Sequence, residues 1–549
     1  MNPTERLAAA GDRELLPTFF SMCGEVARTQ EEVLLDILGA AANSEWGRAH
    51  GFSEVRTVAE YRERQKVTEW EDYAPLAERL EQGKEDILFH GRPVLFLMTS
   101  GTEGAQKLLP ESAAGLAAKN VTGKLRLAAL LRCFPELARE GTILPLANRP
   151  EMGRTSSGIP FGTASGSTLE SFSGPLAGRL AFPMEVLQAE AQETLDYLLL
   201  RFSLGRDVRV VVGNNPGRLV SLLEQADRRR DDLVRDIAEG TVVAGLALDP
   251  ALASALPLRP DPERARVLAA GIAASGCLMP RDFWPNLRLV SFWLSGSVGR
   301  YMADLDPWLP EGVARMDFGY GASEAKLTIP MAPGRTAGPL ALHAQFLEFV
   351  PLDGGKPLLA HEVEDGASYR LLLTTYSGLY RYDLHDVVRV DGFTAGCPDV
   401  VFESKVGDVG NITGERLTGP VLMRIAGGIL AEAGIRARHW CAATDVDRHG
   451  YDLCIELSRG SARPSPDLPL RVDSALRAGV FVYGLMRDQG MLRPLRVRIM
   501  AQGWLERLYA ARVRPGVSTS QVKLPVVVPA VPLPEMVERV LDPAGGAAG

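Results

Sequence analysis

The stretch FLMTSGTEGAQKLLP, residues 96–110, changes abruptly from apolar to hydroxyl-bearing and glycine-rich. The apolar run at 93–98 predicts a buried strand that leads directly into a turn. Because glycine lets successive backbone N–H groups point inward, such a turn can form a nest for an anion. Ser100 and Thr102, on either side of Gly101, add hydroxyl donors. The stretch therefore predicts a phosphate-binding loop, although a plain turn is the commoner role of such residues after a strand.

Lys107 is the single lysine in this stretch, and it could place a compact positive charge beside a phosphate. The loop is not a Walker A loop, because no Gly-Lys-Ser/Thr follows at the required spacing. The stretch alone thus leaves two interpretations open, a nucleotide site and an ordinary turn.

The segments around this loop alternate between helical and strand-like patterns. Residues 1–85 carry apolar side chains at helical spacing, and residues 110–340 alternate helical segments with short β-rich runs such as VRVVVG at 208–213. This alternation is typical of an α/β protein with at least partly parallel sheets. Residues 345–403 are β-rich with turn residues between the runs, which predicts a sheet or a barrel-like element.

The length of the chain predicts more than one domain. A chain of 549 residues exceeds what a single core usually organises. We expect a large N-terminal α/β domain over residues 1–403 and a small α+β C-terminal domain over residues 404–541. The tail at 542–549, DPAGGAAG, is predicted to be disordered.

The composition excludes several classes of protein. A net charge of −8 argues against nucleic acid as the main partner, since phosphate binding needs a basic excess. No window reaches the roughly 18 apolar residues of a membrane span, and the N-terminus lacks a signal-peptide pattern. The six cysteines form no CxxC pair and the seven histidines no HExxH motif. These features favour reduced thiols, a cytoplasmic location and no metal bound by protein alone.

A second stretch with residues suited to binding a ligand is DFGYGASEAKLTIP, residues 317–330. The ring of Tyr320 could stack on a purine, and Glu324 could bind the Mg²⁺ that accompanies a triphosphate. The alternative is an ordinary glycine-containing turn that leads into a strand.

Two further stretches carry one candidate each. Asp386 lies in TTYSGLYRYDLHDVVRVDGF, residues 374–393, where a carboxylate could accept both hydroxyls of a ribose. Lys523 lies in the polar segment VSTSQVKLP, residues 517–525. The alternatives are a solvated hairpin for the first and a surface lysine for the second.

The order of these four stretches is similar to that of one known family. The chain resembles the auxin-responsive, Gretchen Hagen type acyl-acid amido synthetases, which are adenylate-forming enzymes. The matching pieces are TSGTEGAQKLLP, YGASE, TTYSGLYRYDLHDVV and QVKLP. Four motifs in one order over most of the chain are more specific than any single motif. The resemblance implies the α/β architecture of adenylate-forming ligases, with a small, mobile C-terminal domain.

The resemblance also implies a reaction and its partners. A carboxylic acid would react with ATP and Mg²⁺ to give an acyl-adenylate and pyrophosphate. An amine, usually that of an amino acid, would then take the acyl group and release AMP. Two alternatives stay open: a thioester-forming ligase that acts on coenzyme A or a carrier protein, and a nucleotide-binding relative without catalytic activity.

The motifs also imply site residues, which are carried over by position. The resemblance assigns the phosphates to Ser100, Gly101, Thr102 and Ser323. It assigns adenine to Tyr320, the ribose to Asp386 and Mg²⁺ to Glu324. Lys523 would stabilise charge during catalysis, and Thr102 and Glu324 are the further catalytic candidates. A carboxylate that attacks a phosphate brings two anions together, so catalysis depends on positioning and charge neutralisation.

Two positions depart from the family pattern. Relatives usually have glycine where this chain has His385, directly before Asp386. They commonly have an arginine where Ser404 and Lys405 stand, at the hinge expected near 403–406. Lys405 is the candidate to replace it, although lysine lacks the two-pronged donor geometry of arginine. The acid itself stays unidentified; Arg126 and Arg154 are candidates to pair with its carboxylate.

Overall fold

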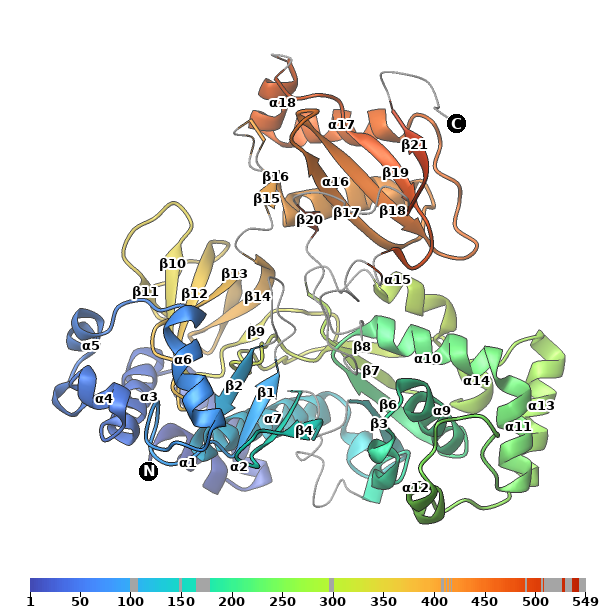
Figure 1. The fold of residues 1–549 in the computed structure, drawn as a ribbon, viewed down its shortest axis with the longest axis horizontal. Coiled ribbons are helices and arrows are strands. Elements are labelled where there is room, and N and C mark those ends of the chain that lie inside the picture. The colour runs from blue at the N-terminus through green and yellow to red at the C-terminus, as the bar shows by residue number, and fades with distance from the viewer. Residues whose placement is uncertain are drawn as a thin grey trace. The chain divides into compact units, whose positions relative to one another are not determined.

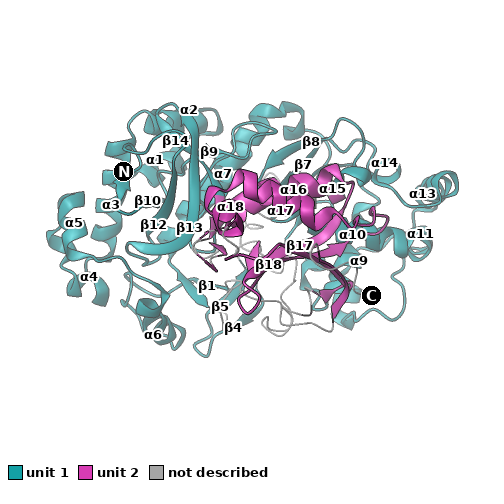
Figure 2. Cartoon of the chain, turned by 90° about the horizontal axis from the view of Figure 1, so that it is seen from above, with its two compact units in different colours: residues 1–101, 106–295, 305–402 teal, residues 102–105, 296–304, 403–549 magenta. Residues whose placement is uncertain are grey.

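The structure of the chain is a computed structural model. It describes residues 1–98, 107–147, 151–163, 178–295, 301–405, 409–410, 412–413, 415, 417–488, 491–504, 507, 526–528 and 536–542. These residues divide into two compact units, shown in different colours in Figure 2. The described residues up to 402 form the first unit, except that 301–304 belong with the residues from 403 onward in the second.

The chain begins with a series of helices, as the helical spacing predicts. They are α1 (Pro3–Ala9), α2 (Asp12–Cys23), α3 (Val26–Ala41), α4 (Glu45–Ala49), α5 (Val58–Arg64) and α6 (Trp70–Glu81). Helix α3 buries Val33, Leu34, Ile37 and Leu38, because positions three and four apart share one helical face. None of the helices in the described ranges is long and apolar enough to cross a membrane.

The strand predicted before the loop is present. It is β1 (Leu95–Met98), which pairs antiparallel with β2 (Leu108–Glu111) and parallel with β5 (Pro160–Thr163). With β4 (Gly153–Arg154) these strands form a sheet of order β2-β1-β5-β4. Helix α7 (Ala113–Cys133) begins directly after β2, with Ser112 as its N-cap.

A four-stranded parallel sheet confirms the predicted α/β alternation. Its order is β3-β6-β7-β8, formed by β3 (Thr142–Leu146), β6 (Val208–Gly213), β7 (Leu289–Phe292) and β8 (Ala314–Asp317). Helices lie between these strands in sequence and beside the sheet in space (Figure 1). They are α9 (Gln192–Ser203), α10 (Pro216–Arg228), α11 (Arg230–Glu239), α12 (Pro250–Ala255), α13 (Pro262–Ser275) and α14 (Pro280–Phe283), and α15 (Tyr301–Leu305) precedes β8.

The β-rich region expected at 345–403 forms most of a six-stranded sheet. Its order is β11-β10-β12-β13-β14-β9, which gives it two edge strands and no closed barrel among the described strands. The strands are β9 (Gly338–Pro339), β10 (Gln345–Pro351), β11 (Leu358–Leu359), β12 (Ser368–Thr375), β13 (Tyr382–Thr394) and β14 (Cys397–Lys405).

The second unit has its own sheet and core. A short ribbon, β15 (Val409–Gly410) and β16 (Leu417–Thr418), precedes a five-stranded sheet of order β20-β17-β18-β19-β21. The sheet strands are β17 (Ala437–Asp445), β18 (Gly450–Leu457), β19 (Arg496–Met500), β20 (Val527–Val528) and β21 (Val537–Leu541). Buried apolar side chains join this sheet to α16 (Gly419–Glu432), α17 (Leu468–Gly479) and α18 (Phe481–Asp488). The mobility predicted for this region stays a prediction, and residues 543–549 lie outside the described residues.

Candidate active site

Three of the residues expected to hold a nucleotide, Tyr320, Ser323 and Glu324, follow β8, whose last residue is Asp317. The buried carboxylate of Asp317 accepts the backbone N–H groups of Leu294 at 2.8 Å and Gly319 at 2.6 Å. These bonds fix the turn after the strand, in which Gly319 has a φ of +94°, a region that costs other residues about 1–2 kcal/mol. Burial raises the pKa of Asp317 to about 6, although both backbone bonds and the nearby Arg126 guanidinium act to lower it.

Tyr320 and Asp386 are brought together by the fold. Both side chains are fully buried, and the Tyr320 hydroxyl donates to Oδ2 of Asp386 at 2.6 Å. Burial, and next the Asp386 charge, hold the pKa of Tyr320 well above its usual value, so the phenol is neutral and able to donate. The backbone N–H of Tyr320 donates to Oγ1 of Thr328 at 2.9 Å, which fixes the residue from its other side. Two motifs far apart in sequence thus share one buried hydrogen bond.

The backbone at His385 has a conformation that favours glycine. His385 has a φ of +55°, in the left-handed region that glycine adopts without a steric penalty. Its backbone N–H donates to Oδ1 of the buried Asp383 at 2.9 Å, which holds this turn in strand β13. The glycine expected here from the family resemblance would suit this backbone, whereas the histidine carries the cost of its Cβ.

A buried ion pair supports the loop that carries Ser323. The ammonium of Lys119 pairs with Glu111 at 2.5 Å and donates to the backbone carbonyl of Ser323 at 2.9 Å. The side chains of Lys119 and Glu111 are only 13% and 2% exposed. The hydroxyl of Ser377 donates to the other oxygen of Glu111 at 2.8 Å, so the carboxylate has partners on both sides. Helix α7 is thereby tied to the Tyr320–Glu324 loop.

Exchanging Lys119 for methionine should lower the stability of the first unit by about 3 kcal/mol or more, because the buried Glu111 carboxylate loses its cation. Lys119→Arg keeps the charge and should cost less. The double variant Lys119→Met/Glu111→Gln should recover part of the loss, since it leaves no unpaired buried charge. Thermal unfolding measures all three, and equal melting temperatures for the parent and Lys119→Met would contradict the prediction.

Glu324 differs from the other carboxylates of this region. It is half-buried, and among the described residues it has no hydrogen bond or ion pair. A partly desolvated carboxylate without a protein partner is better explained as a ligand for a cation than as part of an ordinary turn. The residue is therefore suited to Mg²⁺ bound with a triphosphate.

Helix α7 and the parallel sheet line a partly open cavity of ≈ 90 Å³. Its walls are mainly apolar, and they include Leu127, Leu130, Leu131, Leu137, Ile143, Val210, Val212, Met316 and Phe318. The charged side chains on the lining are Arg126, Lys326 and Asp317, together with the exposed Lys124. Small-molecule sites commonly combine apolar walls with a few polar groups in this way.

Arg126 connects this cavity to the Tyr320 loop. Its Nε donates to the carbonyl of Thr328 and its Nη2 to the carbonyl of Tyr320, both at 2.9 Å. The guanidinium also lies over the ring of Phe318, 5.6 Å from its centroid. Burial lowers the pKa of Arg126 to about 10, so the group stays charged at neutral pH.

Lys326, on the same lining, was not singled out by the sequence analysis. Burial first, and then the nearby charges of Arg126 and Lys119, lower its pKa to about 7. Its ammonium has no hydrogen bond or ion pair among the described residues. The available signal was a lysine among the mainly apolar residues of AKLTIP, directly after the YGASE motif.

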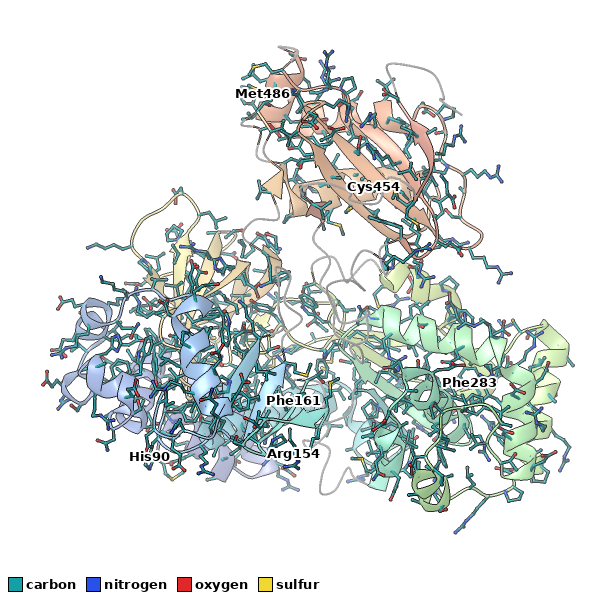
Figure 3. All side chains as sticks on the ribbon, viewed as in Figure 1. His90, Arg154, Phe161, Phe283, Cys454 and Met486 are labelled. Atoms are coloured by element: carbon teal, nitrogen blue, oxygen red, sulfur yellow. The ribbon has the colours of Figure 1, made fainter. Side chains whose placement is uncertain are left out.

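Among the remaining predicted site residues, some lie outside the described residues and others are placed by the structure. Ser100, Gly101, Thr102 and Lys523 lie outside the described residues, so their roles stay predictions. Lys405 is half-buried at the end of β14. Arg154 of β4 is exposed and pairs with Glu151 at 2.8 Å; Figure 3 labels it beside Phe161 of β5. Of the two arginine candidates, Arg126 is the one that lines the cavity.

Family models match most of the chain in three consecutive parts. The GH3 family N-terminal domain matches residues 16–312, the central domain residues 338–405 and the C-terminal domain residues 430–531. The chain belongs to the GH3 family. The family inferred from the four motifs is thereby confirmed, and with it the enzyme class, an ATP-dependent ligase that forms an amide bond.

Similar proteins include plant GH3 enzymes. Indole-3-acetic acid-amido synthetase GH3.4 of Arabidopsis thaliana is 24% identical, over 93% of this chain and 90% of that protein. Jasmonoyl–L-amino acid synthetase JAR4 of Nicotiana attenuata is 24% identical, over 71% of each chain.

Solved structures show the same fold. The GH3.15 acyl acid amido synthetase superposes with a TM-score of 0.83 at 20% identity, over 97% of this chain and 96% of that one. A 2-hydroxyisobutyryl-CoA ligase in the postadenylation state gives 0.51 at 14% identity, over 92% and 90%. The predicted architecture, that of adenylate-forming ligases, is confirmed by these likenesses.

Proposed function

We propose that this GH3 protein adenylates a small carboxylic acid with ATP and Mg²⁺ and transfers the acyl group to the amine of an amino acid. The observation that carries the proposal is the position of Arg126. One side chain lines the apolar cavity and bonds to the carbonyl of Tyr320, in the loop that carries the nucleotide candidates. An acid in the cavity would therefore lie next to the residues proposed to hold ATP.

The reaction joins two anions, and the protein's part is to position and neutralise them. A carboxylate oxygen of the acid bonds to the α-phosphorus as the bond to pyrophosphate breaks. The amine then bonds to the carbonyl carbon, AMP leaves with the bonding electrons, and the amine loses a proton. The Arg126 guanidinium supplies a fixed positive charge for the incoming carboxylate, and its two backbone bonds limit its movement.

The residues proposed to bind the nucleotide have separate roles. Glu324, half-buried and without a protein partner, would hold Mg²⁺, which lowers the repulsion between the phosphates and the acid when it is bound. Asp386 would bind the ribose and Tyr320 would lie at the adenine. Because Asp386 is covered in this structure and bonded to Tyr320, the two residues would have to adjust together when the nucleotide binds.

Several assignments complete the proposal. Ser100, Gly101, Thr102 and Ser323 would contact the phosphates, Lys523 would stabilise charge during adenylation, and Lys405 would take the place of the hinge arginine. A cytoplasmic location agrees with the cysteines, all six of which are free thiols.

The proposal is tested by pyrophosphate release with Mg-ATP across a panel of carboxylic acids, with and without a pool of amino acids. We expect release that depends on the acid, and an amide product when an amino acid is present. Thioester formation with coenzyme A in place of an amide would move the assignment to the thioester-forming alternative. ATP binding by calorimetry without release for any acid would favour the non-catalytic alternative.

A further inference from the structure

Besides the exposed Lys124, the lining of the cavity beside the Tyr320 loop carries two cationic side chains, Arg126 and Lys326, that form no ion pair among the described residues. Arg126 uses Nε and Nη2 on backbone carbonyls, and its Nη1 has no hydrogen-bond partner among the described residues. The ammonium of Lys326 has no hydrogen bond or ion pair within the same part of the chain. Both side chains line the cavity.

The neighbouring carboxylates are already occupied. Asp317 accepts a backbone N–H at each of its oxygens, from Gly319 and Leu294. Glu111 is paired with Lys119 and bonded to Ser377. Asp317 acts electrostatically on Arg126, and Glu111 acts on Lys326. Neither carboxylate forms a hydrogen bond or an ion pair with either cation, so both cations can still bind an anionic ligand directly.

Placing charged groups among apolar walls is costly unless each finds a partner of opposite charge. A substrate with a single carboxylate would pair with one of the two groups, and burial would then favour the neutral form of Lys326, whose pKa is about 7. A second carboxylate beside Lys326 would stabilise its charged form, so a substrate with two anionic groups and an apolar middle would match both groups and the walls. The lining is therefore complementary to a dianion.

We propose that the acid activated by this protein is a small dicarboxylic acid, with one carboxylate at Arg126 and the other at Lys326. This inference depends on the proposed function, since it names the acid for the same site. Arg126 is bonded to the carbonyl of Tyr320, so the carboxylate next to it is the one adenylated. The carboxylate at Lys326 is not activated and sets the preference among acids.

The cavity volume of ≈ 90 Å³ guides the choice of test acids, because it exceeds the space that a single water molecule needs. Hexanedioic acid and benzene-1,3-dicarboxylic acid are small acids with an apolar middle between two carboxylates. Their single-carboxylate counterparts, hexanoic acid and benzoic acid, have the same apolar bodies and serve as matched controls.

The test compares these matched pairs with the full chain. We expect kcat/KM for pyrophosphate release to be about tenfold or more higher for the dicarboxylic member of at least one pair, the size of one charge-assisted hydrogen bond. Calorimetric binding of the same acids without ATP should show the same order. Equal or better use of both monocarboxylic acids would overturn the inference while leaving the proposed function intact. Absence of release for every acid tried, with none bound by calorimetry, would overturn both.

Variants of Lys326 then test the assignment of the second carboxylate. Lys326→Met should lower the ratio of kcat/KM between the dicarboxylic and monocarboxylic members by about tenfold, and Lys326→Arg, which keeps the charge, should preserve most of it. Comparable melting temperatures would show that both variants are folded. An unchanged ratio would overturn the role of Lys326. An effect confined to the KM of the amino acid would overturn it as well, because the cation would then bind the acceptor's carboxylate.

Discussion

Asp386→Ala should abolish acid-dependent pyrophosphate release, with a loss of at least about 100-fold in kcat/KM for ATP. The variant removes the proposed ribose ligand and leaves the buried Tyr320 hydroxyl without its acceptor, which alone costs about 1–3 kcal/mol. Pyrophosphate release as a function of ATP concentration measures the loss, and calorimetric titration with ATP shows whether it lies in binding.

Tyr320→Phe is the matched control for this variant. It removes the same hydrogen bond and keeps both the aromatic ring and the Asp386 carboxylate. If Asp386 contacts the nucleotide, Asp386→Ala should be far more damaging to ATP use than Tyr320→Phe at similar losses of melting temperature. Equal losses of activity in the two variants would mean that Asp386 serves only to anchor Tyr320. Full activity of Asp386→Ala would refute the ribose assignment.

Gly319→Ala should raise the KM for the acid by about tenfold or more and lower the melting temperature. Two effects add at this position. The φ of +94° costs a residue with a Cβ about 1–2 kcal/mol. A Cβ placed there would also lie 2.7 Å from the guanidinium of Arg126, so Arg126 would have to move from the loop carbonyls and the cavity.

Gly334→Ala separates these two effects. Gly334 also has a left-handed backbone, with a φ of +75°, but no atom lies within 4 Å of its added Cβ. The Gly334→Ala variant should therefore lose stability through backbone strain alone and keep the parent KM for the acid. Acid kinetics and thermal unfolding of the two variants check the difference. A similar KM in both would show that the position of Arg126 does not govern acid binding.

Local patterns in the sequence predicted much of the fold. The apolar run before the loop formed strand β1, the helical spacing of α3 placed one face in the core, and VRVVVG became the inner strand β6 of a parallel sheet. These features follow from side-chain periodicity and turn chemistry, which depend on neighbours in the chain. The order of four short motifs likewise predicted the GH3 family, because each motif is local and their order is part of the sequence.

Contacts between distant segments were decided only by the tertiary structure. Three such features depend on which elements pack together. They are the bond from Tyr320 to Asp386, the pairing of Lys119 with Glu111 beside Ser323, and the presence of Arg126 and Lys326 on one cavity lining. Whether a charged side chain is paired depends on the atoms that surround it in space. Sequence spacing specifies no such distances between separate elements. The sequence alone therefore does not distinguish Lys326 from an ordinary lysine, and only the tertiary structure shows that it lines an apolar cavity.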